Sequence, residues 1–279
     1  MNAAKTFLLI VLMTAVLVVI GEVAYGKTGL YIAIVIALVM NFVSYFWSDK
    51  IVLASSGAKL VTQGEAPELY AIVANLAQRA GIPMPRIAII PDETPNAFAT
   101  GRDPEHAVVA CTEGILKLMT RPELEGVLAH ELGHVKHRDI LIISLAAVLA
   151  QAIMFISHMA MWISPRDSEG RSNPIAGIAI MILGPIAAMM LQMAISRSRE
   201  YDADAYSAHI TGRPDLLAGA LERLDAYNRQ EPMVHAQPAT AHLMTVSPLS
   251  GGGLSGMFST HPPIQDRIAR LRSMPVQFT

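Results

Sequence analysis

Four long runs without a charged side chain constrain the fold of this 279-residue chain more than any other feature. They cover residues 6–21, 28–48, 140–165 and 172–196. Each is close to or longer than the about 20 apolar residues that cross a bilayer as a helix. They also explain why only 16% of the residues are charged, against about a quarter in an ordinary soluble protein. We therefore expect a membrane protein with four transmembrane helices in two hairpins.

Two of these placements have alternatives. The first run could be a cleaved signal peptide, but no small-x-small cleavage site follows it and the second run comes at once. The third and fourth runs could instead form a buried or re-entrant hairpin. Their polar residues Gln151, His158 and Gln192 are costly in lipid and would face a protein interior. For the second pair, both arrangements stay open.

The basic residues that flank the runs predict the orientation. The side with the amino terminus carries Lys5, Lys50, Lys59, Lys136, Arg138, Arg197 and Arg199, whereas the opposite loops carry Lys27, Arg166 and Arg171. By the positive-inside rule, both termini face the cytoplasm. The net charge of −2 gives no reason to expect a nucleic-acid partner.

A His-Glu-x-x-His motif at residues 130–134 is the main candidate for chemistry. On a helix, His130 and His134 lie one turn apart on the same face, where two imidazoles can hold one metal ion and Glu131 can reach a water beside it. Thr120 and Glu123 form a capping box that begins such a helix. The alternative, two solvated histidines on an ordinary helix, is weakened by this placement in the third turn.

A catalytic zinc ion takes three protein ligands and leaves one position open. A metzincin would have glycine and histidine three and six residues after His134, but the chain has His137 and Ile140 there. The other common solution is a glutamate on a separate helix. Glu200 and Asp204 are four residues apart, so Glu200 would be the third ligand and Asp204 would orient a ligating imidazole. The alternative is that both carboxylates are solvated.

The spacing of apolar residues, and the glycines and prolines between the apolar segments, predict the remaining elements. We expect a surface helix at residues 65–80, short strands at 86–90, 96–100 and 106–111, and helices at 198–210, 214–228 and 264–271. The helix that begins at Arg121 has no stop signal before Asp139 and is expected to run directly into the third span. Residues 230–259, rich in glycine and proline, predict a flap. The expected divisions are residues 1–48 and 139–196 for the two membrane hairpins, with 49–138 and 197–279 as the two parts of one protease-like domain.

In four motifs that together span most of its length, the chain resembles the HtpX heat-shock proteases, which are membrane-integrated zinc metallopeptidases related to the CAAX prenyl protease. The motifs are residues 96–101, 130–134, 198–204 and 259–263. The resemblance implies a mainly α fold with a small β-sheet, in which a zincin-like (gluzincin) cytoplasmic domain binds one zinc ion per chain. It also implies a multi-pass protein of the bacterial inner membrane that takes part in the stress response. Its partners would be the lipid bilayer and the unfolded or misfolded membrane proteins that it cleaves on the cytoplasmic side.

The resemblance also implies roles for individual residues. Glu131 would act as the general base of peptide hydrolysis. His261 and Arg267, in or near the last motif, are both candidates for stabilising the oxyanion, and the sequence does not choose between them. An extended substrate would pair with a strand made of Asn96, Ala97, Phe98, Ala99 and Thr100.

A different class of function has to be weighed as well, namely a membrane scaffold or transporter whose metal is structural. A structural zinc would close its fourth position with a cysteine or histidine. Glu131 would then have no task, so the motif favours the peptidase. The only cysteine, Cys111, is expected to be buried in a strand.

The charge asymmetry predicts the outcome of a reporter experiment. A reporter that is active only outside the cytoplasm should work when fused at Glu169 and fail when fused at Thr279, because the basic flanks stay on the cytoplasmic side. Enzymatic activity of the two fusions in intact cells measures this. The reverse pattern would overturn the orientation.

Overall fold

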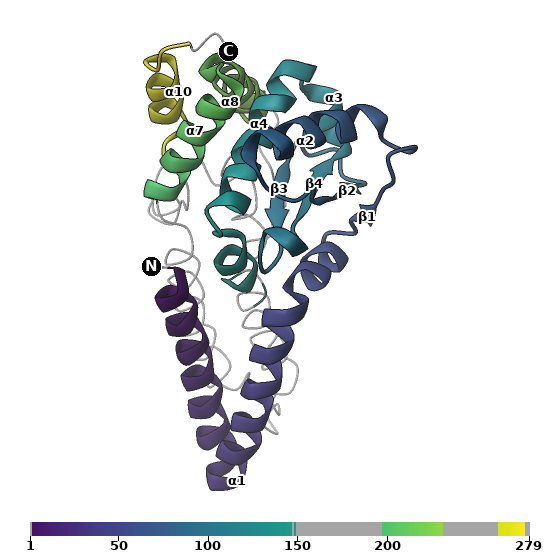
Figure 1. Cartoon of the computed structure of the whole chain (residues 1–279). Coiled ribbons are helices and arrows are strands. Elements are labelled where there is room, and N and C mark those ends of the chain that lie inside the picture. Colours follow the sequence, from purple (N-terminus) through teal and green to yellow (C-terminus); the bar gives the residue numbers. More distant parts are fainter. Residues whose placement is uncertain (1, 147, 149–196, 231–261, 277–279) are drawn as a thin grey trace.

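The computed structural model describes residues 2–146, 148, 197–230 and 262–276, and the statements below concern these residues. They form a helical protein with one small sheet (Figure 1). In chain order the elements are α1 (Asn2–Ser55), β1 (Lys59–Leu60), α2 (Pro67–Ala80), β2 (Arg86–Ile90), β3 (Ala97–Thr100), a 3-10 turn (Pro104–His106), β4 (Val108–Thr112), α3 (Glu113–Leu118), α4 (Arg121–Lys136), α7 (Arg197–Thr211), α8 (Pro214–Gln230) and α10 (Ile264–Arg272).

Helix α1 is folded back on itself into a hairpin, whose two arms lie side by side below the rest of the molecule (Figure 1). Gly26 has a φ of 62°, a left-handed conformation that favours glycine, and it marks the turn. The side chain of Asn41 donates to the hydroxyl of Thr14 at 3.0 Å. In a straight helix these two residues would be about 40 Å apart, so the contact requires the fold-back.

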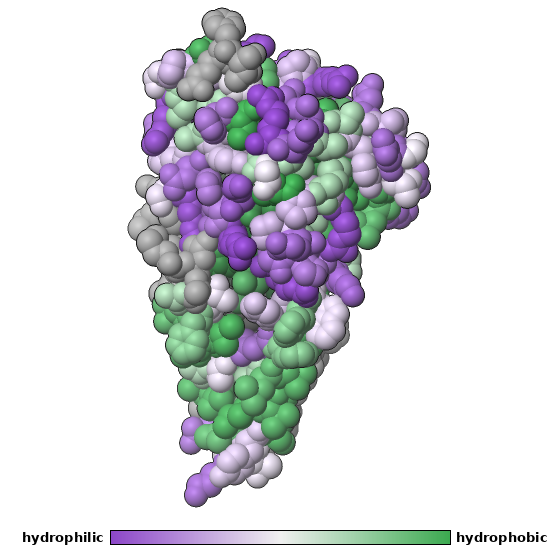
Figure 2. All heavy atoms as spheres, viewed as in Figure 1, coloured by the Kyte–Doolittle hydropathy of each residue, from purple (hydrophilic) through white to green (hydrophobic). Residues whose placement is uncertain are grey.

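The hairpin carries the apolar surface expected of a membrane-inserted segment. Figure 2 shows hydrophobic residues gathered over it, whereas hydrophilic residues dominate the part above. Among the residues that the structure describes, only Gly26–Ser55 is both long and apolar enough to cross a membrane, and Thr6–Val19 is apolar but shorter. The third and fourth predicted spans and the predicted flap at 230–259 lie almost wholly outside the described residues. Four spans therefore stay a prediction.

The sheet has the strand order β1-β2-β4-β3. Strands β2 and β4 run parallel, whereas β1 and β3 are antiparallel to their neighbours. This topology leaves β3 at an edge, paired through Ala99 with Val109 and through Thr100 with Val108. The strands expected at 86–90, 96–100 and 106–111 are confirmed as β2, β3 and β4.

Side chains alternate between the two faces of this sheet, and both faces are covered. Ile87 and Val109 belong to the main core, which packs against the helices α2, α4, α7, α8 and α10. Ala88 and Val108 belong to a smaller core on the other face, together with Val52 from the end of α1. The apolar hairpin of α1 is therefore packed directly onto the sheet.

The expectation that the helix beginning at Arg121 runs directly into the third span is wrong. Helix α4 ends at Lys136, Arg138 adopts a left-handed φ of 57°, and a new helical segment begins at residue 140. The amide of Arg138 donates to the carbonyl of Val135, and that of Asp139 to the carbonyl of His134, which is a Schellman motif. Glycine or asparagine normally signals this turn, and an arginine in their place hides it from a sequence pattern.

Two glycines of α4 let neighbouring helices approach closely. A Cβ added to Gly126 would lie 2.6 Å from the backbone nitrogen of Leu217 in α8. A Cβ added to Gly133 would lie 3.3 Å from the Cα of Ala203 in α7. The hydroxyl of Ser207 in α7 also donates to the Gly126 carbonyl at 2.8 Å. Helix α4 is thus the central element against which α7 and α8 are set.

The contact at Gly126 predicts a stability effect. Gly126→Ala should destabilise the protein by about 1–3 kcal/mol, because the new methyl group meets backbone atoms that cannot move away cheaply. Gly219→Ala in α8 is the matched control, since its Cβ would meet only the Glu123 side chain at an ordinary 3.7 Å. That control should be neutral or stabilising by up to about 1 kcal/mol. Thermal melting in detergent compares the two, and equal melting temperatures would contradict the close approach.

Candidate metal centre

The two histidines of the motif lie on one face of α4 and are both buried. Their rings are 4.9 Å apart between centroids and nearly perpendicular, at 89°. His130 is 2% and His134 5% exposed. The capping box predicted at Thr120 is present and begins this helix. The sequence therefore places both imidazoles where the spacing of the motif predicts.

Helix α7 brings Glu200 against both imidazoles. One carboxylate oxygen lies 3.7 Å from Nε2 of His130, and the other lies 3.5 Å from Nε2 of His134. The ligand atoms of all three residues lie within 4.8 Å of one another. The close passage of α7 over Gly133 makes this possible, although Glu200 follows His134 only after the whole second apolar pair.

The spacing of these atoms fits a tetrahedral metal ion. Ligand atoms about 2.0–2.1 Å from a tetrahedral zinc are about 3.4 Å from one another. One Glu200 oxygen lies near this distance from Nε2 of His130 and the other from Nε2 of His134, while the three ligand atoms together lie within 4.8 Å of one another. Two imidazoles and one carboxylate also form a common donor set of catalytic zinc sites.

The charge of the buried cluster fits a divalent cation as well. The buried ionisable side chains described around the two imidazoles are four carboxylates and two guanidinium groups: Glu131, Asp139, Glu200, Asp204, Arg199 and Arg267. With neutral imidazoles, the formal charges of these six side chains sum to −2, and an excess of negative charge is costly in a buried site. Burial would lower the pKa of His134, but the surrounding carboxylates, Asp139 foremost, outweigh it and raise the pKa to about 9. The site thus strongly favours added positive charge.

Behind His130 stands the predicted orienting residue Asp204. Its carboxylate lies 3.0 Å from Nδ1 of His130. It also accepts two hydrogen bonds from the guanidinium of Arg267, at 2.9 and 2.7 Å. Burial alone would raise the pKa of Asp204, but Arg267 and His130 together hold it at about 2. The carboxylate therefore stays ionised and can fix the imidazole with Nε2 toward Glu200.

Behind His134 stands a second carboxylate that the sequence reasoning missed. Asp139 lies 3.7 Å from Nδ1 of His134, and Arg199 lies 3.1 Å from its other oxygen. The Schellman motif at the end of α4 brings His134 and Asp139 together, since it sets the third residue before the C-cap His137 beside the second residue after it. The sequence does show a carboxylate five residues after the motif, Asp139. It faces His134 only because α4 ends after Lys136, and the sequence pattern did not show that break.

Glu131 lies beside the metal ligands and is tied to the sheet. The amide of Ala99 in β3 donates to one of its carboxylate oxygens at 3.0 Å. Burial raises the pKa of Glu131, and the neighbouring Glu200 carboxylate adds to this, while the two histidines and the Ala99 amide oppose it. A raised pKa makes this carboxylate a stronger proton acceptor, which suits a general base.

The other predicted site residues divide into three groups. Ala97, Phe98, Ala99 and Thr100 form the edge strand β3, and Asn96 precedes it with its carbonyl paired to the Thr112 amide. Arg267 is 1% exposed and lies behind Asp204, with Nη1 3.6 Å from Glu200. His261 lies outside the described residues, so its role stays a prediction. The geometry thus gives Arg267 a part in holding the ligands.

Comparisons with known proteins give matches along almost the whole chain. The model of Peptidase family M48 matches residues 63–275. A protease HtpX homolog from Desulforapulum autotrophicum is 56% identical over 277 residues, covering 97% of this chain and 89% of the relative. Another from Ralstonia pickettii is 51% identical over 276 residues, covering 98% of this chain and 96% of the relative.

A solved structure shares the fold. The crystal structure of Ste24p from S. mikatae superposes with a TM-score of 0.51 at 21% sequence identity, over 92% of this chain. The chain spans 61% of the length of that protein. The family model covers both the motif on α4 and the Glu200 segment on α7, and the HtpX homologs align along almost the whole sequence. The chain therefore belongs to peptidase family M48.

Proposed function

We propose that this protein is a zinc-dependent endopeptidase of the bacterial inner membrane, which cleaves misfolded or damaged membrane proteins on the cytoplasmic side. The observation that carries the proposal is the buried arrangement of His130, His134 and Glu200 with Glu131 beside it. Three ligands leave a fourth position of a zinc ion open, as catalytic sites require. A zinc ion in this place would supply Lewis acidity, which polarises a peptide carbonyl and makes a water molecule acidic near pH 7.

The residues of the chain divide the remaining work. His130, His134 and Glu200 would hold the ion, and Asp204 and Asp139 would keep the two imidazoles turned toward it. Glu131 would take the proton of the attacking water on the carboxylate oxygen that does not accept from Ala99, and pass it to the leaving amine. The edge strand β3 borders Glu131 and offers backbone groups with which an extended peptide can pair.

The membrane part of the proposal has separate support. The apolar hairpin of α1 packs against the sheet of the peptidase domain, which would hold the site close to the bilayer. The basic flanks of the apolar runs favour a cytoplasmic site. Pairing with β3 through backbone atoms suits unfolded substrates of varied sequence, such as damaged proteins. Lipid bilayer and unfolded proteins are accordingly the proposed partners, and no feature favours nucleic acid.

Purified protein in detergent should cleave casein, which is naturally unfolded. A chelator should stop the cleavage, and added zinc should restore it, because removal of the ion leaves the base without an activated water. Gel electrophoresis of the products measures this, and the Glu131→Gln protein from the same preparation controls for contaminating proteases. Cleavage that persists in the chelator and in Glu131→Gln would sink the proposal, as would zinc binding with no cleavage at all.

The different roles given to the carboxylates predict different metal contents. Glu131→Gln should keep one zinc per chain while losing turnover, because Glu131 is a base and not a ligand. Glu200→Ala should lose both, since two imidazoles alone bind the metal weakly. Asp204→Ala should lie between, with about a 10–100-fold loss of metal affinity or activity. Elemental analysis and casein cleavage are measured side by side.

Glu68→Ala serves as the matched control for these variants, because Glu68 is exposed in the first turn of α2. It should keep both zinc and activity. If Glu200→Ala kept full zinc while Asp204→Ala lost it, the roles of the two carboxylates would have to be exchanged.

A further inference from the structure

The backbone polar groups of β3 point alternately toward its partner strand β4 and toward helix α4. The carbonyl of Asn96 accepts a hydrogen bond from Thr112 at the end of β4. In an antiparallel pair, backbone groups of successive residues point to opposite sides. Ala99 therefore directs its amide away from β4, and this amide is the one that meets Glu131. The outer edge of β3 is thus the edge that an extended substrate would meet beside the base.

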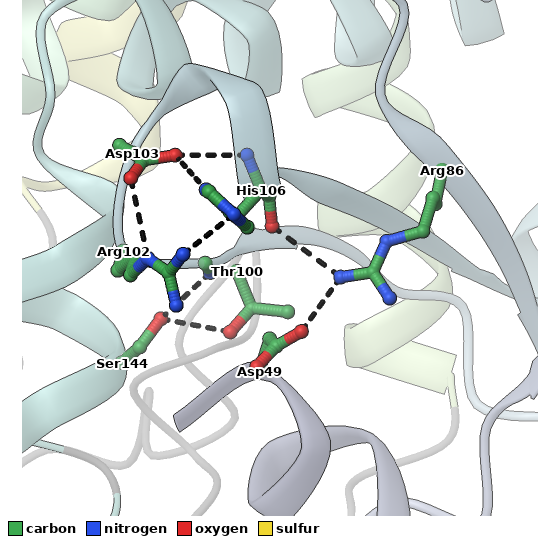
Figure 3. A network of polar contacts seen from close by, with 8 residues as sticks. Asp49, Arg86, Thr100, Arg102, Asp103, His106 and Ser144 are labelled. Atoms are coloured by element: carbon green, nitrogen blue, oxygen red, sulfur yellow. Dashed lines mark hydrogen bonds and ion pairs between the residues drawn. The ribbon is translucent and has the colours of Figure 1, made fainter. Parts of the chain in front are cut away.

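The carboxyl end of β3 is held by a buried pair of hydroxyl groups. The hydroxyls of Thr100 and Ser144 are 2.8 Å apart, and the amide of Gly101 donates to the Ser144 oxygen at 3.3 Å (Figure 3). Both side chains are 0% exposed. Ser144 lies in the helical segment that follows the break after α4 and opens the third apolar run. This run and the edge strand are therefore joined at one point.

The turn that follows β3 is tightly closed and has a second attachment. A Cβ on Gly101, whose φ is 136°, would lie 2.6 Å from the carbonyl oxygen of His106, so the turn closes tightly on itself. Arg86 contacts that carbonyl at 3.5 Å and pairs with Asp49 at 2.6 Å (Figure 3). Asp49 lies near the end of α1. The same end of β3 is thus attached to both apolar parts of the chain.

We propose that Ser144 is a positioning residue for substrate binding: its hydroxyl fixes the end of β3, and so sets the strand edge with which the substrate pairs. The inference rests on the proposed peptidase function. A hydroxyl pair buried this deeply has to be satisfied internally, and here it is satisfied across the junction between the edge strand and the third run. Loosening it shifts the strand relative to Glu131 without touching a metal ligand.

The test compares Ser144→Ala, Thr100→Val and the double variant of the full chain in detergent, with casein as the substrate. KM should rise about tenfold in each single variant, more than kcat falls, because substrate pairing is lost before the chemistry. The double variant should be little worse than either single one, since both remove the same contact. Zinc content should stay at one per chain.

Two further variants separate positioning from general stability. Thr100→Ser keeps the hydroxyl, so its rise in KM should be smaller than that of Thr100→Val. Ser273→Ala removes an exposed hydroxyl that donates to the Arg270 carbonyl, and it should have the wild-type KM. Early melting together with loss of zinc in both Ser144→Ala and Thr100→Val would overturn the inference. If the wild-type protein cleaves casein, an unchanged KM in both variants would overturn it as well. A wild-type protein that does not cleave casein would instead contradict the proposed function itself.

Discussion

The crossing of α4 and α7 at Gly133 is the contact on which the metal centre depends. Glu200 is one turn before Ala203 on α7, so the distance between the two helix axes decides whether its carboxylate reaches the imidazoles of α4. A Cβ at position 133 would lie 3.2–3.5 Å from Tyr206 and Ala203, so α7 would have to give way by a few tenths of an ångström. Shifts of that size already matter for a zinc site, whose bonds are about 2.0–2.1 Å long. The glycine in the middle of the motif is thus part of the ligand geometry.

Around this crossing the two imidazoles are held in matching ways. Each Nδ1 faces an aspartate, and each aspartate is held by an arginine, which gives the chains His130–Asp204–Arg267 and His134–Asp139–Arg199. Arg267 and His130 hold the pKa of Asp204 at about 2, and each aspartate faces the Nδ1 side of its imidazole, which leaves both Nε2 atoms toward Glu200. Such fixed orientation lowers the reorganisation that metal binding and catalysis would otherwise need.

Much of this could be predicted from local patterns. The capping box at Thr120, the helix expected at 65–80 and the three short strands all depend on near neighbours in sequence, and the structure has them as expected. The His130–Glu131–His134 spacing belongs to the same class, and the pairing of Glu200 with the motif followed from donor chemistry. The sequence did not reveal the features that depend on the backbone conformation of a single residue, Arg138. Arg138 gives no sign that it will adopt a left-handed turn, so neither the end of α4 nor the role of Asp139 could be found.

The interlocking of distant segments has a consequence for biogenesis. The ligands of one metal ion come from either side of residues 140–196, and the arginine behind Asp204 comes from α10, near the end of the described chain. During synthesis from the amino terminus, α4 and its histidines leave the ribosome long before α7 and α10 exist. The nascent chain therefore carries no complete site until residues 140–196 have been made and α7 and α10 have followed them. A protease assembled in this order acquires its activity only late in its own synthesis, which protects the unfinished chain from cleavage by itself.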